Sequence, residues 1–294
     1  MTLQKKATLV ASATSTLLIF IKLTIGIMSG SVAVLASAID SVLDLIVSVF
    51  NFFAVTKSEQ PADKVFNYGR GKIEALAAVI EGTVITMSGV YIFYVAIRKA
   101  FGGEETKLLE TSIIVMLISL VITIALVLYL NYVAKKTGSM VIKSDALHYK
   151  TDIFTNGAIL VSLVMIQFTS WQIIDSIIGG LIAIYIISEA YKIIKEGVYV
   201  LLDGALEDKQ VEHIEHIINS EEGLTSYHFL KTRTSGHNNF VDVHLVFTSD
   251  ILLLEAHRIS DHIEERIALL DPTREWVMNM HLDPYDDSVA EHHH

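Results

Sequence analysis

The chain of 294 residues lacks cysteine and has few prolines and few charged residues, and each shortage narrows the class of protein. Without cysteine there are no disulfides and no thiolate metal sites, so a metal site must be built from His, Asp and Glu. Only 19% of the residues are charged, against about a quarter in soluble domains. Together with 52% hydrophobic residues, this balance indicates a membrane protein.

The charges that are present are unevenly distributed. The formal net charge is −11, and the last third of the chain carries many charged residues whereas the first two thirds carry few for their length. This split predicts a membrane domain followed by a soluble acidic domain. No basic patch with interleaved aromatic residues occurs, so the pattern excludes nucleic acid as a partner.

Six segments have the roughly 20 mostly apolar residues that a membrane-spanning helix needs. They are residues 8–28, 33–55, 74–98, 111–134, 145–168 and 172–193. Lys and Arg gather at alternate connections between these segments, for example at Lys5, Lys57, Arg70 and Lys135. By the positive-inside rule, this asymmetry predicts six spans in a lipid bilayer with both termini in the cytoplasm.

From about Asp203 the periodicity changes to that of a soluble fold. Residues 207–220 and 253–270 have helical period, whereas 226–235, 238–247 and 274–283 alternate in the manner of strands. The expected fold is therefore an all-α transmembrane domain of six helices followed by an α+β domain of order α-β-β-α-β. We place the boundaries at 1–202 and 203–287, with 288–294 as a tail whose histidines are interpreted as the remnant of an affinity tag.

Two of the apolar segments carry pairs of metal-ligand residues. Asp40 and Asp44 stand at i and i+4 in one segment, and His148 and Asp152 repeat that spacing in another. Each pair projects from one helix face, and a charge inside a bilayer is costly unless it is paired or metal-bound. Three carboxylates and an imidazole suit a tetrahedral Zn²⁺ site, with Fe²⁺, Co²⁺, Cd²⁺ and Mn²⁺ as alternative occupants.

A simpler interpretation is that intramembrane carboxylates only form hydrogen bonds between helices. We favour that interpretation for Asp145 and Asp175, which lie near the ends of predicted spans. The four paired residues favour a metal site instead. Because metal binding requires neutral His and ionised Asp, metal and protons compete for such a site. One pH unit of gradient supplies about 1.4 kcal/mol per proton, so proton–metal exchange is energetically sufficient.

The soluble part carries a second set of ligand-type residues. Its members lie on predicted strands, on a helix and at the end of the last strand, and are His228, His244, His257, His281 and Asp283. An α-β-β-α-β layer allows these positions to converge. His213 and His216 are three residues apart on a polar helix and are interpreted as solvated.

Several motifs resemble the cation diffusion facilitator family, most closely the bacterial YiiP/FieF-type zinc and iron efflux transporters. The motifs are "SAIDSVLD", "YGRGKIEALAA", "SDALHYKTDIFTNGAIL", "LLDGALED", "HFLKTR", "EAHRISD" and "HLDP", in order over nearly the whole chain. The resemblance implies a homodimeric exporter of Zn²⁺ or Fe²⁺ in a bacterial inner membrane, driven by inward proton movement. It assigns Asp40, Asp44, His148 and Asp152 to the transport site.

The same resemblance assigns roles outside the membrane. It implies that His228, His244, His257, His281 and Asp283 hold a binuclear metal site that stabilises the cytoplasmic dimer. Lys72 and Asp203 match positions of a salt-bridge network that interlocks the two subunits.

One departure from the family pattern concerns the loop between the second and third spans. The family type has a metal site there of the form D-x-x-H-x-x-x-H, whereas this chain keeps Asp63 but has Phe66 and Arg70 at the histidine positions. Phe has no ligand atom, and the fixed positive charge of Arg would repel a metal ion. We therefore expect this loop site to be absent.

Two functions of other classes fit the sequence less well. An intramembrane hydrolase of the two-aspartate kind needs carboxylates that face each other across two helices, whereas Asp40 and Asp44 share one helix. A membrane-anchored metal sensor would have no use for four intramembrane ligands. The sequence therefore predicts a transporter and not an enzyme.

Overall fold

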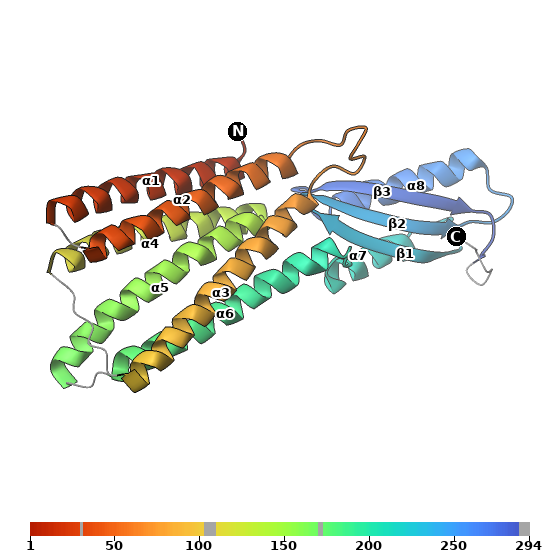
Figure 1. Ribbon diagram of the computed structural model, residues 1–294. Coiled ribbons are helices and arrows are strands. Elements are labelled where there is room, and N and C mark those ends of the chain that lie inside the picture. The colour runs from red at the N-terminus through yellow and green to blue at the C-terminus, as the bar shows by residue number, and fades with distance from the viewer. Residues whose placement is uncertain (30–31, 103–109, 170–172, 288–294) are drawn as a thin grey trace. The chain divides into compact units, whose positions relative to one another are not determined.

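The computed structural model describes residues 1–29, 32–102, 110–169 and 173–287, and it separates into two compact units. The first unit spans Met1–Val198 and the second Tyr199–His294. Long helices make up the described part of the first unit (Figure 1). They are α1 (Leu3–Ser29), α2 (Val32–Ser58), α3 (Lys72–Gly102), α4 (Glu110–Thr137), α5 (Met140–Thr169) and α6 (Ile173–Leu201).

The helices follow the apolar segments of the sequence. Within the described ranges, five stretches are long and apolar enough to cross a membrane: Leu3–Ile25, Ser41–Ser58, Lys72–Arg98, Ile113–Thr137 and Ser176–Leu201. These stretches lie in α1, α2, α3, α4 and α6. Helix α5 covers the fifth predicted span, residues 145–168, and its crossing of the membrane stays a prediction.

The helices of this unit pack through small side chains and apolar layers. Helix α1 packs against α2 and α4, and α5 contacts α2, α3 and α4. One core cluster joins Ala7 and Ala11 of α1 to Leu130 of α4 and Ile142 of α5. Helices α3 and α6 approach closely where Gly82 faces Ile194, because a Cβ atom at Gly82 would lie 2.9 Å from Cγ1 of Ile194.

The second unit has the order α-β-β-α-β, which confirms the predicted fold class. Its elements are α7 (Asp208–Asn219), β1 (Ser226–Ser235), β2 (Asn238–Val246), α8 (Leu253–Ala268) and β3 (Glu275–Asp283). The three-stranded sheet has the order β1-β2-β3. Strands β1 and β2 are antiparallel, whereas β3 runs parallel to β2.

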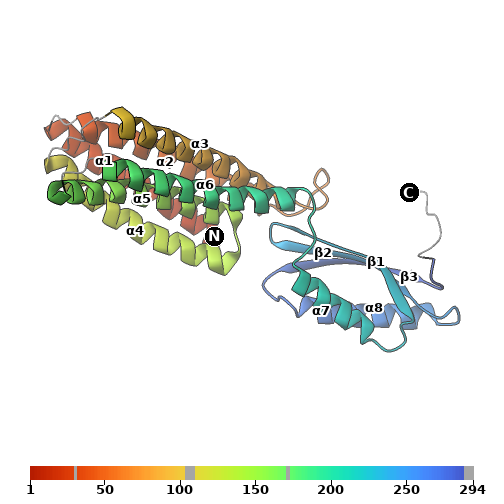
Figure 2. The same ribbon diagram turned by 90° about the horizontal axis from the view of Figure 1, so that it is seen from below.

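Both helices of the second unit cover the same face of the sheet (Figure 2). Val243 and Leu245 of β2 pack there with Ile214 of α7 and Ile263 of α8. Because side chains alternate along a strand, the intervening residue His244 points to the opposite face. This helix-free face carries the ligand-type residues of the strands.

Candidate metal centres

Three of the four residues predicted for the membrane site lie close together in the first unit. One ligand atom each of Asp44, His148 and Asp152 lies within 4.8 Å of the others. Nε2 of His148 is 3.2 Å from Oδ1 of Asp44, which joins α5 to α2. The side chain of the fourth residue, Asp40, lies outside the described residues. The arrangement offers an imidazole and two carboxylates, a donor set that suits Zn²⁺ and similar cations.

A buried hydroxyl cluster orients α5 beside this site. The Tyr149 hydroxyl, next in sequence to His148, lies 2.7 Å from Oγ of Ser15 on α1 and 2.7 Å from Oγ of Ser48 on α2. All three side chains are buried. Since buried polar groups are costly without partners, these bonds fix the rotation of α5 and thus the direction of His148.

Sequence analysis missed one buried acidic residue of this unit, Glu81. Glu81 of α3 is buried and accepts a hydrogen bond from Nδ2 of Asn51 on α2 at 3.2 Å. Asp145 of α5 is fully buried, and neither of its carboxylate oxygens makes a hydrogen bond within the described part of the chain, so the structure does not support the hydrogen-bonded interpretation of this residue. The side chain of Asp175 lies outside the described residues. The available signal was the occurrence of an acidic residue, Glu81 itself, inside the apolar run of α3.

The histidines of the second unit form a row across the sheet. His228 of β1 pairs in register with His244 of β2, which pairs with His281 of β3. The ring centroids are 5.0 Å apart for the first pair and 4.6 Å for the second. A register shift follows His228, with Phe229 in the left-handed region at φ 52°. Bulges of this kind often lie beside functional sites, where they re-aim side chains.

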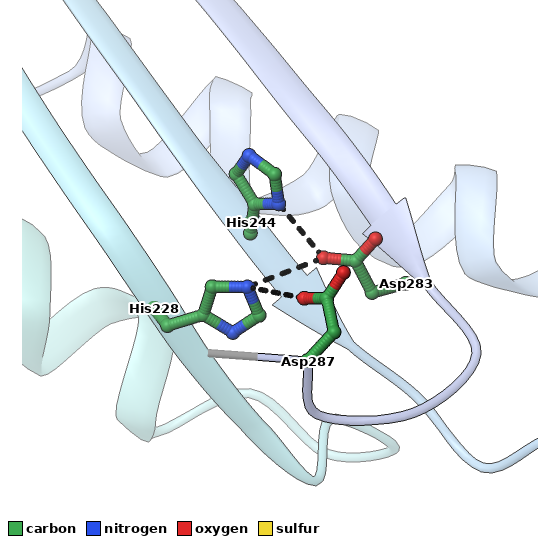
Figure 3. Close-up of side chains that lie close together, drawn as sticks. All are labelled: His228, His244, Asp283 and Asp287. Carbon is green, nitrogen blue, oxygen red and sulfur yellow. Dashed lines mark hydrogen bonds and ion pairs between the residues drawn. The ribbon is translucent and has the colours of Figure 1, made fainter. Parts of the chain in front are cut away.

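Carboxylates at the end of β3 complete this cluster (Figure 3). Oδ2 of Asp283 is 2.8 Å from Nδ1 of His244 and 3.5 Å from Nε2 of His228. Oδ1 of Asp287 lies 3.1 Å from Nε2 of His228. One ligand atom from each of these four residues lies within 4.8 Å of the others. The sequence analysis did not include Asp287.

Two residues predicted for the same site lie differently. His281 is mostly exposed, and its Nε2 is 3.1 Å from the other oxygen of Asp283, Oδ1. His257 on α8 is exposed beside Asp261. Because α8 packs on the opposite face of the sheet, a single chain does not bring His257 to the row. Its role as a ligand stays a prediction.

The loop between α2 and α3 is organised by Asp63. Its carboxylate accepts hydrogen bonds from the amides of Val65 and Phe66, each at 2.8 Å, and pairs with Arg70 at 2.5 Å. Cζ of Arg70 lies 4.3 Å from the centre of the Phe66 ring. These amide bonds and the guanidinium hold the pKa of the Asp63 carboxyl below its usual range. The absence of a metal site in this loop stays a prediction.

The predicted interlock residues belong to different units. Lys72 is the first residue of α3, and Asp203 follows α6 with φ 56° and pairs with Nη1 of Arg233 at 3.2 Å. A salt bridge between Lys72 and Asp203 across a dimer stays a prediction.

Two family models match successive parts of the chain. Residues 8–202 match the cation efflux transmembrane domain, and residues 206–293 match the cytoplasmic domain of cation efflux proteins. The chain belongs to the cation efflux family. It is therefore a multi-pass membrane transporter of metal cations and not an enzyme, as the sequence predicted.

Cation-efflux pumps of several bacteria match the chain over almost its full length. The chain is 35% identical to the cation-efflux pump FieF of Klebsiella pneumoniae over 96% of this chain and 93% of that protein. The corresponding pumps of Citrobacter koseri and Escherichia coli are 34% and 33% identical, with the same coverage. A solved zinc form of CzrB is 30% identical over 27% of this chain and 90% of that chain, with a TM-score of 0.25.

Proposed function

We propose that the protein exports a divalent transition metal, Zn²⁺ or Fe²⁺, from the cytoplasm and lets protons move inward in exchange. The observation that carries this proposal is the grouping of Asp44, His148 and Asp152 on two helices of the transmembrane unit. Asp40, one turn before Asp44 on α2, would supply a fourth ligand. Cd²⁺ and Co²⁺ accept the same donor set and are expected as further substrates.

Proton exchange follows from the chemistry of these ligands. A metal ion binds to neutral imidazole and ionised carboxylates, so its arrival displaces protons and protonation releases it. Each 100 mV of membrane potential adds about 2.3 kcal/mol per charge moved. Access that alternates between the two membrane sides would then convert the proton gradient into metal efflux.

We infer a separate, structural role for the second unit. His228, His244, His281 and Asp283 would hold metal ions, with His257 contributed by a second copy of the chain. Asp283 supports a binuclear site because Oδ2 faces His228 and His244, whereas Oδ1 faces His281. A metal shared in this way would stabilise a homodimer, and Lys72 and Asp203 would interlock its two subunits. The dimer would lie in a bacterial inner membrane with both termini in the cytoplasm.

Transport by purified protein in sealed vesicles tests the proposal. With an imposed pH gradient, vesicles that contain the protein should move Zn²⁺ or Fe²⁺, and Asp44→Ala or Asp152→Ala should abolish this movement. Asp250→Asn, an exposed carboxylate in the β2–α8 connection, is the matched control and should transport normally. A normal rate of metal transport in Asp44→Ala or Asp152→Ala would refute the membrane site. A transport rate that does not depend on the pH gradient would refute proton exchange.

The division of labour between the two sites is tested separately. His228→Ala should weaken metal binding by the second unit and leave measurable transport. If His228→Ala and Asp44→Ala lost transport equally, the separate structural role of the second unit would be wrong.

A further inference from the structure

The chain turns back after β3 and brings a carboxylate to the histidine row. The backbone amide of Phe247 donates to the carbonyl of Asp283 at 2.8 Å, which anchors the end of β3. Pro284 follows directly and has no amide hydrogen with which to continue the ladder. Figure 3 shows the segment reversing beyond Asp283, so that the Asp287 side chain lies beside the His228 ring.

Two neighbouring aspartates in this segment differ in their placement. Oδ1 of Asp287 is 3.1 Å from Nε2 of His228, and the Asp287 side chain is only 17% exposed. Asp286 is 53% exposed, and its Oδ1 lies 3.6 Å from the other ring nitrogen, Nδ1. Of these two aspartates, Asp287 belongs to the four-residue cluster found among the described residues and Asp286 does not. The chain therefore directs one of two adjacent carboxylates into the cluster.

The surroundings of the His228 imidazole favour cation binding over hydrogen bonding. Its side chain is 9% exposed, and neither ring nitrogen makes a hydrogen bond within the described part of the chain. A buried polar group without a hydrogen bond costs about 1–3 kcal/mol. A metal ion that accepts the lone pair of Nε2 removes this cost at the nitrogen that faces Asp283 and Asp287, while Nδ1 faces Asp286.

The distances in the cluster match those between ligands of one small ion. Ligand atoms at 2.0–2.1 Å from a tetrahedral Zn²⁺ lie roughly 3.4 Å apart. Three of the six separations among ligand atoms of His228, His244, Asp283 and Asp287 are 2.8, 3.1 and 3.5 Å, and all six are at most 4.8 Å. Two imidazole nitrogens and two carboxylate oxygens form a complete tetrahedral set.

We propose that Asp287 is the fourth protein ligand of the metal ion held by His228, His244 and Asp283. This inference rests on the proposed metal site of the second unit and makes it more specific. One chain then closes the first ion's coordination by itself, as in structural zinc sites, which have four protein ligands. The second ion, between Oδ1 of Asp283 and His281, has two ligands from this cluster and depends on a second copy.

Zinc binding by the full-length protein in detergent tests this assignment. The variants are placed in an Asp44→Ala background, which silences the membrane site, and Zn²⁺ affinity is measured by competition with a chromophoric chelator. Asp287→Asn should weaken the tighter cytoplasmic site by at least about tenfold, since even outer partners of metal ligands are worth about 10–100-fold. Asp250→Asn is the matched control because it makes the same change at an exposed carboxylate in the β2–α8 connection, and it should bind as the background protein does.

A third variant separates the existence of the cytoplasmic metal site from the role of Asp287 as one of its ligands. His244→Ala removes an imidazole of the cluster and should abolish the tighter site. If His244→Ala weakens Zn²⁺ binding but Asp287→Asn binds as tightly as Asp250→Asn, then Asp287 is not a ligand and the proposed cytoplasmic site stands. If His244→Ala also leaves Zn²⁺ binding unchanged, both the site and the role of Asp287 are refuted.

Discussion

Nε2 of His148 lies 3.2 Å from Oδ1 of Asp44, although the two residues are 104 positions apart in the chain. This contact joins α2 and α5 at their ligand-bearing faces. Residues from two i, i+4 pairs that the sequence places on separate helices thereby meet, since Asp44 lies with His148 and Asp152. The side chain of Asp40 lies outside the described residues, and its part in the site stays a prediction. The position of α5 against its neighbours is therefore a condition for the proposed transport site.

Tyr149→Phe should destabilise the protein and disturb the membrane site. The change leaves the buried hydroxyls of Ser15 and Ser48 without the bonds of 2.7 Å that they make to Tyr149. We expect a loss of about 1–3 kcal/mol in stability, together with slower metal transport. Thermal unfolding in detergent and vesicle flux measure the two effects. Tyr132→Phe, at an exposed position of α4, is the control, and an equal effect there would contradict this role of Tyr149.

Gly82→Ala should weaken the close packing of α3 on α6. A Cβ atom at this position would lie 2.9 Å from Cγ1 of Ile194 and 3.5 Å from the carbonyl oxygen of Ala190. Overpacking of this kind typically costs about 1–3 kcal/mol, measured as a lower unfolding temperature in detergent.

Gly157→Ala in α5 is the matched control for that substitution. No described atom lies within 4 Å of a Cβ atom at Gly157, and alanine is favoured over glycine inside a helix by about 1 kcal/mol. Gly157→Ala should therefore leave stability unchanged or raise it. A loss at Gly157 as large as that at Gly82 would show that packing is not the cause.

The loop held by Asp63 should loosen only in acid. The pKa of its carboxyl is lowered in the folded protein by the amides of Phe66 and Val65 and by Arg70. The stabilising contribution is therefore present above the ordinary pKa of about 4 and is lost as the pH falls through the lower folded value. Amide hydrogen exchange of Val65 and Phe66, corrected for its intrinsic pH dependence, should show this loss. In Asp63→Asn the pH dependence should disappear, and its persistence would contradict the assignment.

Removal of metal should destabilise the second unit through the histidine row. An ion present at 100 times its dissociation constant stabilises the folded state by about 2.7 kcal/mol. Chelation should therefore speed hydrogen exchange in β1 and β3. His244→Ala should be insensitive to the chelator, whereas Asp250→Asn should respond as the wild type does. A full response in His244→Ala would place the stabilising ion elsewhere.

Local patterns in the sequence predicted the helices and the element order well. A segment inside a bilayer must satisfy its own backbone hydrogen bonds, so a long apolar segment there is helical. Length and hydropathy are therefore sufficient to recognise α1, α2, α3, α4 and α6. The alternation of residues 226–235 and 238–247 likewise predicted β1 and β2. These features depend on neighbours within a few residues, so no tertiary information was needed.

Contacts between residues far apart in the chain were much harder to predict from the sequence. The sequence indicated that His228 and His244 belong to one set, but their pairing depends on the register of β1, which shifts after His228. His257 appeared equally suitable by residue type, yet α8 covers the other face of the sheet. Glu81 and Asn51 lie on different helices, and no local period connects them.

By itself, the sequence determined the membrane unit, the soluble α-β-β-α-β unit and the ligand types, because periodicity and composition are local properties. The tertiary structure alone decided which ligands meet. It brought Asp44 to His148 through helix packing, and it turned the chain after Pro284 so that Asp287 joined the histidine row. Both outcomes depend on interactions between residues far apart in the chain or beyond a strand end, where no spacing rule applies.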